Sequence, residues 1–208
     1  MSENLYKFRA IDKYAIDILM RRRLFLSDWE NLNDPHEAKM LVTMPGINFH
    51  MNPKRLKEKG LLDDLPVTRV CSLAATWWSN LLWTHYAEEQ RGIAIGIALP
   101  GELSDIQKIK IKYDDEIPQE SLPLGRESII RALGHKSSEW KYEEETRLVS
   151  FGNDRRYVEG VEITDVIFGL RASQTDIELV KELVKNSSIK LSQTCHKPGT
   201  YKLNRAEL

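Results

Sequence analysis

One apolar segment, GIAIGIAL at Gly92–Leu99, constrains the fold more than any other part of the sequence. Successive side chains of a β-strand point to opposite faces, and both alternating sets are apolar here. A strand of this kind is stable only when both of its faces are covered, which places it inside a sheet. The sequence therefore predicts a central β-strand at Gly92–Leu99, with other elements packed on both sides of it.

The other periodic segments mix the repeats of strands and of helices. We expect further strands at Leu5–Arg9, Leu24–Ser27, Val67–Leu73, Ile106–Tyr113, Glu143–Phe151, Val161–Gly169, Ile189–Gln193 and Tyr201–Leu203. We expect a first helix in which Ile11, Ala15, Ile18 and Leu19 recur at helical spacing, with Asp12 as N-cap and Arg21–Arg23 at its C-terminal end. Further helices are expected at Ser79–Glu89 (burying Leu81, Leu82 and His85), Ser121–Lys136 and Thr175–Lys185. Residues 45–65 are expected to form a surface excursion with a short helix at Pro53–Lys59. Because strands and helices do not alternate strictly, we predict an α+β fold: one domain over residues 1–208, with a mixed or mostly antiparallel central sheet and flanking helices.

Net charge, cysteine content and the lengths of the apolar runs predict the cellular location and the kinds of partner. The 208 residues carry a formal net charge of −1, so nucleic acid is not indicated as a partner. Cys71 and Cys195 are too few for a disulfide framework and lie outside any Cys-x-x-Cys pattern, which predicts reduced thiols. The start MSENLYKFR lacks the apolar segment of a secretory signal, and no apolar run approaches the roughly 20 residues that span a bilayer. We therefore expect a cytoplasmic protein with no membrane partner.

The stretch WKYEEETRLVS at Trp140–Ser150 places three glutamates in front of an apolar run. In a strand, Glu143, Glu145 and Arg147 share one face with Val149, so two carboxylates lie on a face that becomes covered. Glutamate is depleted in strands, and buried carboxylates need a partner. Either an ion network, such as Glu145 with Arg91 or Arg9, or a ligand is expected there.

Two other segments could carry chemistry. NLNDPHEA at Asn31–Ala38 is typical of a helix start, with Asp34 as N-cap and Glu37 at the third helical position; such a start also suits an anion. WWSNLLWTHYAEEQRG at Trp77–Gly92 has more polar aromatic side chains than one apolar helix stripe can hold. Core packing explains some of them, and the others are expected to border a cleft or an interface. The candidates there are Trp83, His85, Tyr86 and, before the central strand, Arg91.

Three segments together resemble a microbial and phage family known as domain-of-unknown-function family 2971. They are N-D-P-x-E at Asn33–Glu37, L-x-W-x-H-Y-A-(x)4-R-G at Leu81–Gly92, and K-(x)3-W-x-Y-E-x-E-x-R at Lys136–Arg147. The opening L-Y-K-F-R and V-I-F-G at Val166–Gly169 fit as well, so the resemblance covers most of the chain. His36 departs from the aromatic residue that is usual in the family. The family supplies no settled activity, but the motifs mark Lys7, Asn33, Asp34, Trp140 and Arg147 as candidate ligand-binding residues.

The order of elements also resembles the ADP-ribosyltransferase fold, whose members cleave the nicotinamide–ribose bond of NAD through an oxocarbenium-like state. The resemblance implies that Arg9 binds the phosphates or ribose, that Ser27 or Tyr86 seats nicotinamide, and that Glu145 is the catalytic carboxylate, with Glu143 as its substitute. NAD is then the substrate, and no metal is expected. A macromolecular acceptor would take the ADP-ribosyl group, as in a toxin or a phage-conflict effector.

Three hypotheses remain open. The first is the NAD-consuming enzyme, which requires a cleft lined by Arg9, Tyr86 and Glu145. The second is a non-catalytic module that binds a nucleotide, another anion or a protein partner. The third is a metal-dependent nuclease or phosphoesterase that uses Asp34, Glu37, Glu143 and Glu145 and needs a divalent ion.

Overall fold

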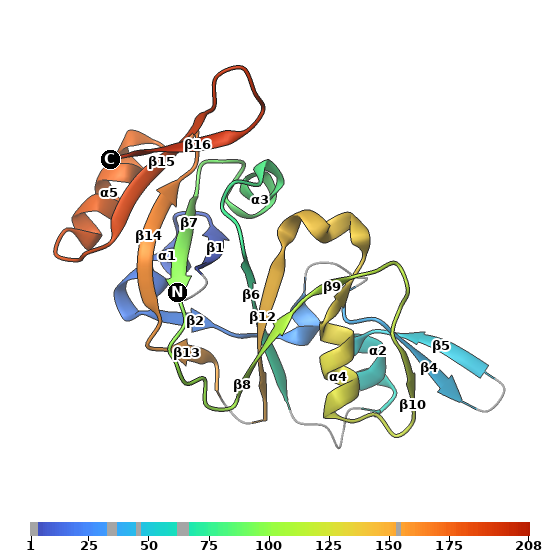
Figure 1. Cartoon of the computed structure of the whole chain (residues 1–208). Helices are drawn as coiled ribbons and strands as arrows, with labels where there is room; N and C mark the ends of the chain where they lie inside the picture. Colours follow the sequence, from blue (N-terminus) through green and yellow to red (C-terminus); the bar gives the residue numbers. More distant parts are fainter. Residues whose placement is uncertain (1–3, 33–36, 45–46, 62–66, 153–154) are drawn as a thin grey trace.

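The structure is a computed structural model that describes residues 4–32, 37–44, 47–61, 67–152 and 155–208 (Figure 1). Its main feature is a nine-stranded sheet of order β16-β15-β14-β7-β1-β6-β12-β8, with β3 paired to β6 off this path. The strands are β1 Leu5–Arg9, β3 Ser27–Asp28, β6 Thr68–Ala74, β7 Ile93–Ala98, β8 Ile106–Lys110, β12 Glu145–Phe151, β14 Glu162–Phe168, β15 Lys190–His196 and β16 Leu203–Glu207. Pairing is antiparallel except between β14 and β15. The predicted α+β class, a mixed sheet with flanking helices in a single domain, is confirmed.

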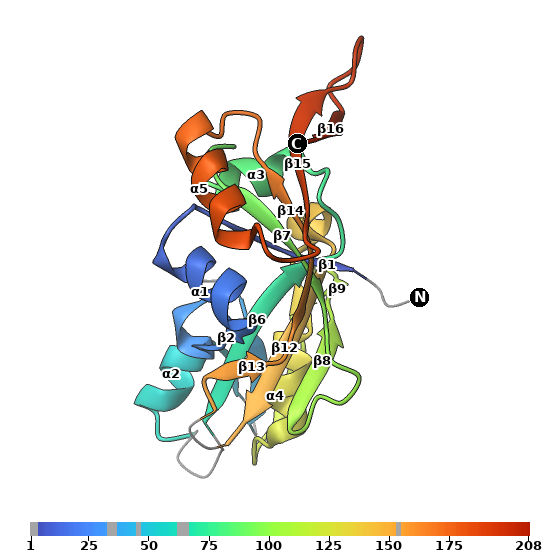
Figure 2. The same ribbon diagram turned by 90° about the vertical axis from the view of Figure 1, so that its left-hand side faces the viewer.

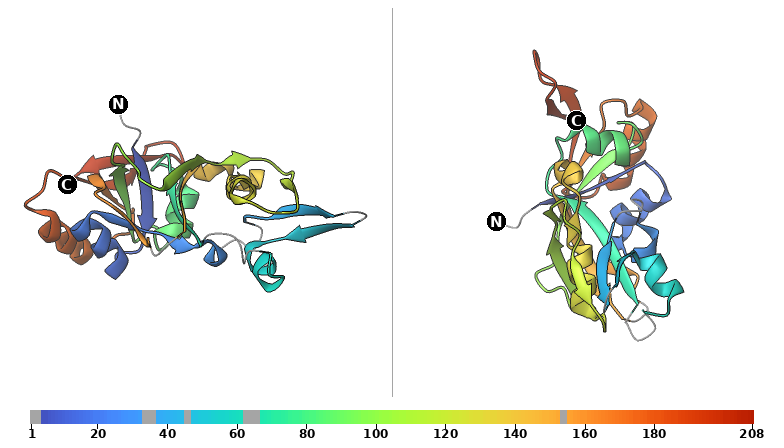
Figure 3. Two further views of the ribbon diagram at one scale, coloured as in Figure 1. Left: turned by 90° about the horizontal axis from the view of Figure 1, so that it is seen from below. Right: turned by 90° about the vertical axis from the view of Figure 1, so that its right-hand side faces the viewer.

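Strand β7 lies between β14 and β1, and all of its residues are buried, as its sequence predicts. The two faces of this part of the sheet are covered by different helices, which Figures 2 and 3 show from the side and from below. The helices α1 Lys13–Arg21 and α5 Gln174–Val184 pack on one face. On the other face, α3 Asn80–Tyr86 buries Trp83 against Phe8, with ring centroids 5.1 Å apart.

The other half of the sheet, around β6 and β12, covers a separate apolar cluster that includes Trp29, Met40, Leu56 and Val149. The elements packed there are η1 Trp29–Asn31, β4 Met40–Met44, β5 Ile47–Met51, α2 Pro53–Glu58 and α4 Arg126–Leu133, and β10 Gln119–Ser121 pairs with β4. Strands β10, β4 and β5 form a small sheet, and the β4–β5 hairpin extends away from the body (Figure 1). Within residues 45–65, the predicted short helix is present as α2, and Met51 and Leu56 are buried.

Two short pairings complete the frame of the cleft described below. Strand β2 Arg23–Phe25 pairs with β13 Tyr157–Glu159, and β9 Lys112–Tyr113 pairs with β11 His135–Lys136. The 3-10 helix η2 Ser138–Glu143 follows β11 and leads into β12. Within the described ranges, no helix is long and apolar enough to cross a membrane.

Several expected elements differ in length. Helix α4 begins only at Arg126 and ends at Leu133, because Pro123 and Gly125 interrupt the chain before it and Gly134 caps it. Helix α3 ends at Tyr86, because the backbone takes positive φ at residues 88–90 in order to turn into β7.

Three local expectations are wrong. In α3 the buried side chains are Leu82 and Trp83, whereas Leu81 is 47% exposed and His85 is also exposed. Glu143 belongs to η2 and not to a strand. No helix follows Glu37: it forms a turn with Ala38, and β4 begins at Met40. The proposed N-cap itself, Asp34, lies outside the described residues.

Candidate functional site

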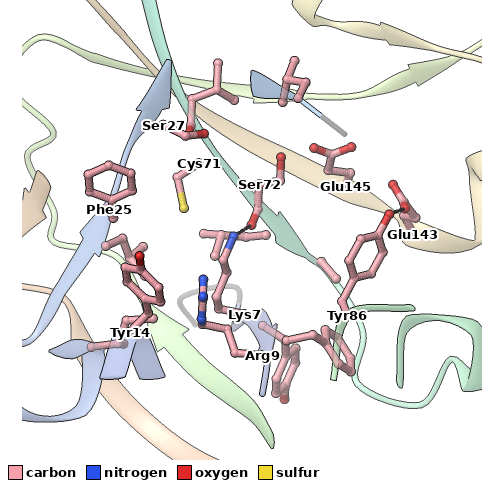
Figure 4. Close-up of a pocket in the computed structure, with 18 of the residues that line it drawn as sticks. Lys7, Arg9, Tyr14, Phe25, Ser27, Cys71, Ser72, Tyr86, Glu143 and Glu145 are labelled. Atoms are coloured by element: carbon pink, nitrogen blue, oxygen red, sulfur yellow. Dashed lines mark hydrogen bonds between the residues drawn. The ribbon is translucent and has the colours of Figure 1, made fainter. Parts of the chain in front are cut away.

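A cleft of about 750 Å³ lies between the first half of the chain and the start of β12 (Figure 4). Its lining combines three kinds of side chain: cations from β1 and α1, aromatic rings from α1, β2, α3 and β13, and carboxylates next to β12. The polar and aromatic members discussed below are Lys7, Arg9, Tyr14, Phe25, Ser27, Glu37, Ser72, Tyr86, Lys136, Glu143, Glu145 and Tyr157. A concave site in which a few polar groups converge among rings is the usual form of a small-molecule pocket.

The cationic part of the lining comes from alternate residues of β1. Strand geometry places Lys7 and Arg9 on the same face, and Figure 4 shows them between Tyr14 and Phe25 on one side and Tyr86 with the carboxylates on the other. The Lys7 ammonium donates to the backbone oxygen of Ser72 at 2.9 Å, and in the described part of the chain it has no carboxylate partner. Within the described ranges, the Arg9 guanidinium pairs with one carboxylate, Asp12 at 3.4 Å, and its buried Nε has no acceptor.

The aromatic rings stand on both sides of these cations. The rings of Phe25 and Tyr157 meet edge to face, with centroids 5.6 Å apart, and the Arg9 guanidinium lies 5.0 Å from the centre of the Tyr14 ring. Tyr86 stands opposite them, at the end of α3 (Figure 4). The cleft therefore offers flat apolar faces beside positive charge.

The acidic part is a buried cluster, here called the carboxylate cluster: Glu37, Glu143 and Glu145 around the Lys136 ammonium. The distances from Lys136 Nζ are 2.6 Å to Glu143, 2.9 Å to Glu37 and 3.4 Å to Glu145. Glu143 ends η2 and Glu145 begins β12, and the left-handed Glu144 between them has φ 44°. The turn at Glu144 lets both neighbours reach the same ammonium.

Arg147 closes the cluster from inside the protein. Its Nε donates to Glu145 Oε1 at 2.7 Å and its Nη2 to Glu145 Oε2 at 3.1 Å, while Nη2 also donates to Glu37 Oε1 and Nη1 to the backbone oxygen of Leu133. The Arg147 side chain is fully buried. Glu145 is therefore held in place by a forked guanidinium, which is a strong and directional contact.

The two glutamates of the E-x-E pair have opposite pKa shifts. Burial raises the pKa of Glu143, and the contacts with Lys136 and Tyr86 only partly offset this effect; the Tyr86 hydroxyl donates to Glu143 Oε1 at 2.7 Å. Burial also acts on Glu145, but Arg147 and Lys136 outweigh it and lower the pKa of Glu145 to about 2. A pair of carboxyls separated in this way can supply one proton carrier and one fixed charge.

The pKa values of Lys136 and Tyr113 are also set by burial together with the nearby charges. Burial lowers the pKa of Lys136, but the three carboxylates outweigh this effect and raise the pKa above its ordinary value, so the ammonium stays charged. Burial raises the pKa of Tyr113 to about 12, and its phenolic oxygen accepts the backbone N–H of Glu145 at 2.7 Å.

The structure brings together only some of the residues that the sequence singled out. The cleft lining includes Lys7, Arg9, Ser27, Tyr86, Glu143 and Glu145. Asn33 and Asp34 lie outside the described residues. Ser27 donates to the backbone oxygen of Val70 at 3.2 Å.

The other candidates lie elsewhere. Trp83 is fully buried in the core, and its indole N–H donates to the backbone oxygen of Trp77 at 2.7 Å. Arg147 lies behind the cleft and acts on it through Glu37 and Glu145. The exposed His85 ring stacks obliquely toward Tyr142, with centroids 6.4 Å apart.

The expected ion partners of Glu145 were wrong, because neither Arg91 nor Arg9 reaches it. Arg91 is exposed and pairs with Glu89 at 2.9 Å. Trp140 is half-buried outside the lining, and Lys136 Nζ lies 4.7 Å from the centre of its ring.

Sequence reasoning missed the central role of Lys136 and the rings of Tyr14, Phe25 and Tyr157. Lys136 stands at the head of the same motif as the two glutamates, so its position alone could have identified it. The rings come from three separate segments that only the fold brings together, and no local pattern marks them.

The nuclease hypothesis depends on carboxylates that converge on a metal. In the described ranges, no group of three or more His, Cys, Asp or Glu side chains is arranged to hold a metal ion. Glu37, Glu143 and Glu145 converge instead on the Lys136 ammonium, and Asp34 lies outside the described residues.

No family model, curated protein or solved structure matches the chain. The resemblance to domain-of-unknown-function family 2971 and to ADP-ribosyltransferases therefore stays a prediction.

Proposed function

We propose that the cleft binds a phosphate-bearing nucleotide of the NAD class. The observation that carries this proposal is the pair of cations, Lys7 and Arg9, that line an aromatic cleft. Lys7 contacts only a backbone oxygen, and the single carboxylate near Arg9 is Asp12 at 3.4 Å, within the described residues. The buried Arg9 Nε has no acceptor among the described residues, and leaving such a donor unpaired is costly. A phosphate oxygen would supply the acceptor and the negative charge.

The rings in the lining support a nucleotide over a simple anion. Phe25 and Tyr86 line the cleft on either side of the cations. Two further rings have cations over them: Arg23 lies 3.7 Å from the centre of the Tyr157 ring, and Arg9 and Lys13 lie 5.0 and 5.1 Å from that of Tyr14. Stacking of a base on an aromatic side chain contributes about 1–3 kcal/mol and tolerates any base. A ligand with both a phosphate and a flat ring contacts both the cations and the rings of the lining. The free thiols Cys71 and Cys195 are suited to a reduced cytoplasmic setting.

Cleavage of the N-glycosidic bond of NAD, with transfer of ADP-ribose to an acceptor, is a second candidate. It is favoured by the carboxylate cluster, in which three carboxylates face two cations, Lys136 and Arg147. Negative charge placed before the reaction would stabilise a positive charge that develops on the ribose. Both oxygens of Glu145 are held by Arg147, so in this candidate Glu145 is a fixed negative charge and Glu143 is the group that moves a proton.

Binding is tested by calorimetric titration of NAD into the wild type, Arg9→Gln and Lys7→Gln. We expect each substitution to weaken NAD binding about tenfold or more, since a hydrogen bond to a charged group contributes about 1.5–3 kcal/mol. Arg91→Gln is the matched control, because it removes the same charge at an exposed position outside the cleft. A wild type that does not bind NAD would overturn the proposal.

Catalysis is tested separately by release of nicotinamide from NAD, with and without cellular extract as a source of acceptor. The wild type should release nicotinamide and Glu143→Gln should not. Tight binding of NAD without any release would leave the binding function in place and remove the second candidate.

A further inference from the structure

Glu37 has one carboxylate oxygen without a partner in the part of the chain that the structure describes. Its Oε1 forms an ion pair with Lys136 at 2.9 Å and accepts a hydrogen bond from Arg147. Its Oε2 is buried and has no hydrogen-bond partner among the described residues, although Glu37 belongs to the lining of the cleft. The Glu37 side chain is only 2% exposed.

The two cations of the carboxylate cluster donate to other acceptors. Lys136 Nζ donates to Glu143 and Glu145 and forms an ion pair with Glu37 Oε1. Arg147 donates to Glu145, to Glu37 Oε1 and to the backbone oxygen of Leu133. A buried acceptor without a donor costs about 1–3 kcal/mol, so a native structure that keeps one calls for an explanation.

We propose that Glu37 is a ligand-recognition residue, and that its Oε2 accepts a hydrogen bond from a sugar hydroxyl of the bound nucleotide. The inference rests on the proposed function, because it assumes that Lys7 and Arg9 hold the phosphates. The carboxylate cluster has one more carboxylate than cations, so the group that enters next to it must be a donor and not a second anion. A nucleotide with a second sugar beyond its diphosphate supplies both an anion for Lys7 and Arg9 and a hydrogen-bond donor for Glu37. Its phosphates would face β1 and its sugar hydroxyls would face Glu37.

The substitution Glu37→Gln tests this directly, because the amide fits in only one orientation. Lys136 and Arg147 are donors, so the carbonyl oxygen of the glutamine must take the place of Oε1. Its NH₂ group then replaces Oε2 and presents a donor where the ligand also brings a donor. The shape of the side chain is kept, and the hydrogen-bonding polarity at this one position is reversed.

The probes are ADP-ribose and the β-methyl ester of ADP, which have the same diphosphate charge but differ in the second sugar. We expect the wild type to bind ADP-ribose about tenfold more tightly than the methyl ester, and Glu37→Gln to lose this preference while it binds the ester as the wild type does. Glu120→Gln is the matched control: Glu120 is a buried carboxylate held by Arg131 outside the cleft, and both affinities should stay unchanged.

The outcomes separate the two proposals. If the wild type binds neither probe, the proposed function fails and the role of Glu37 fails with it. If the wild type binds both probes equally, or if Glu37→Gln weakens both or neither, the nucleotide site stands and the role of Glu37 is overturned. The comparison of probes on the wild type needs no variant, so it decides the question even if Glu37→Gln does not fold.

Discussion

Arg147 and Glu145 stand two residues apart on β12 and are joined by two hydrogen bonds, from Nε to Oε1 at 2.7 Å and from Nη2 to Oε2 at 3.1 Å. Alternation along a strand puts both side chains on the same covered face as Val149. The strand tolerates a glutamate at its buried start because its own sequence supplies the cation two positions later. Lys136 supplies the second cation from β11.

Arg147→Met should destabilise the protein by about 3–5 kcal/mol. Removing one partner of a buried ion pair leaves the other charge uncompensated, and here Glu145 and Glu37 would both lose the guanidinium. The free energy of unfolding is measured by urea denaturation. Lys57→Met is the control: it breaks the exposed pair with Glu30, which should cost no more than about 1 kcal/mol. Similar losses in the two variants would contradict the buried network.

Glu145 and Glu143 act on the pH dependence of stability in opposite directions, so their summed contribution should be largest near pH 4.5. The pKa of Glu145 is lowered from its ordinary value of 4.5 to about 2, so its contribution is present above pH 4.5 and is lost as pH falls toward 2. The pKa of Glu143 is raised above 4.5, so its contribution is present below pH 4.5 and is lost as pH rises through the raised value.

The substitution Glu143→Gln tests the loss of stability that we expect as pH rises through the raised pKa of Glu143. Urea unfolding between pH 3 and pH 8 should show a decline in stability above pH 4.5 for the wild type and little or no decline for the variant. The acid side of the two curves should stay parallel, because Glu145 is unchanged. Parallel curves across the whole range would mean that Glu143 does not titrate at a raised pKa in the folded protein.

Local patterns were sufficient to predict most of the sheet. Strand β7 follows from an apolar run with both faces covered, and α1 follows from helical spacing after Asp12, which caps it through the N–H groups of Tyr14 and Ala15. These features depend on neighbours in the sequence, so the sequence alone reveals them.

The carboxylate cluster could be predicted only in part. That the glutamates need a cation follows from burial, but the identity of the cation depends on which strands pair. Arg91 precedes the central strand in the sequence, yet the turn at residues 88–90 leaves it exposed with Glu89. Glu37 pairs with Lys136 although 99 positions separate them in the sequence. Hydrophobic periodicity predicts local elements and cannot predict a contact between such distant residues.

Gly92→Ala should weaken both folding and NAD binding. A Cβ at residue 92 would lie 2.1 Å from the backbone oxygen of Arg9, and backbone atoms cannot move aside as a flexible side chain can. We expect a loss of about 1–3 kcal/mol in stability, typical of overpacking, and a weaker affinity because Arg9 is displaced. Gly101→Ala is the control, because a Cβ there meets no atom within 4 Å. Equal stability of the two variants would show that β1 and β7 do not approach so closely at Arg9.

Tyr86 contacts both the proposed nucleotide site and the carboxylate cluster, because its ring lines the cleft and its hydroxyl donates to Glu143 at 2.7 Å. Tyr86→Phe keeps the ring and removes the donor, so the pKa of Glu143 should rise further and stability at neutral pH should fall by about 1.5–3 kcal/mol, while NAD affinity is kept. Tyr86→Ala also removes the ring, so NAD affinity should fall about 5- to 150-fold, equivalent to about 1–3 kcal/mol of stacking. Urea denaturation and calorimetric titration of both variants separate the two effects. If Tyr86→Phe weakens NAD binding as much as Tyr86→Ala does, the hydroxyl and not the ring contacts the nucleotide, and Glu143 shares its hydrogen bond with the ligand.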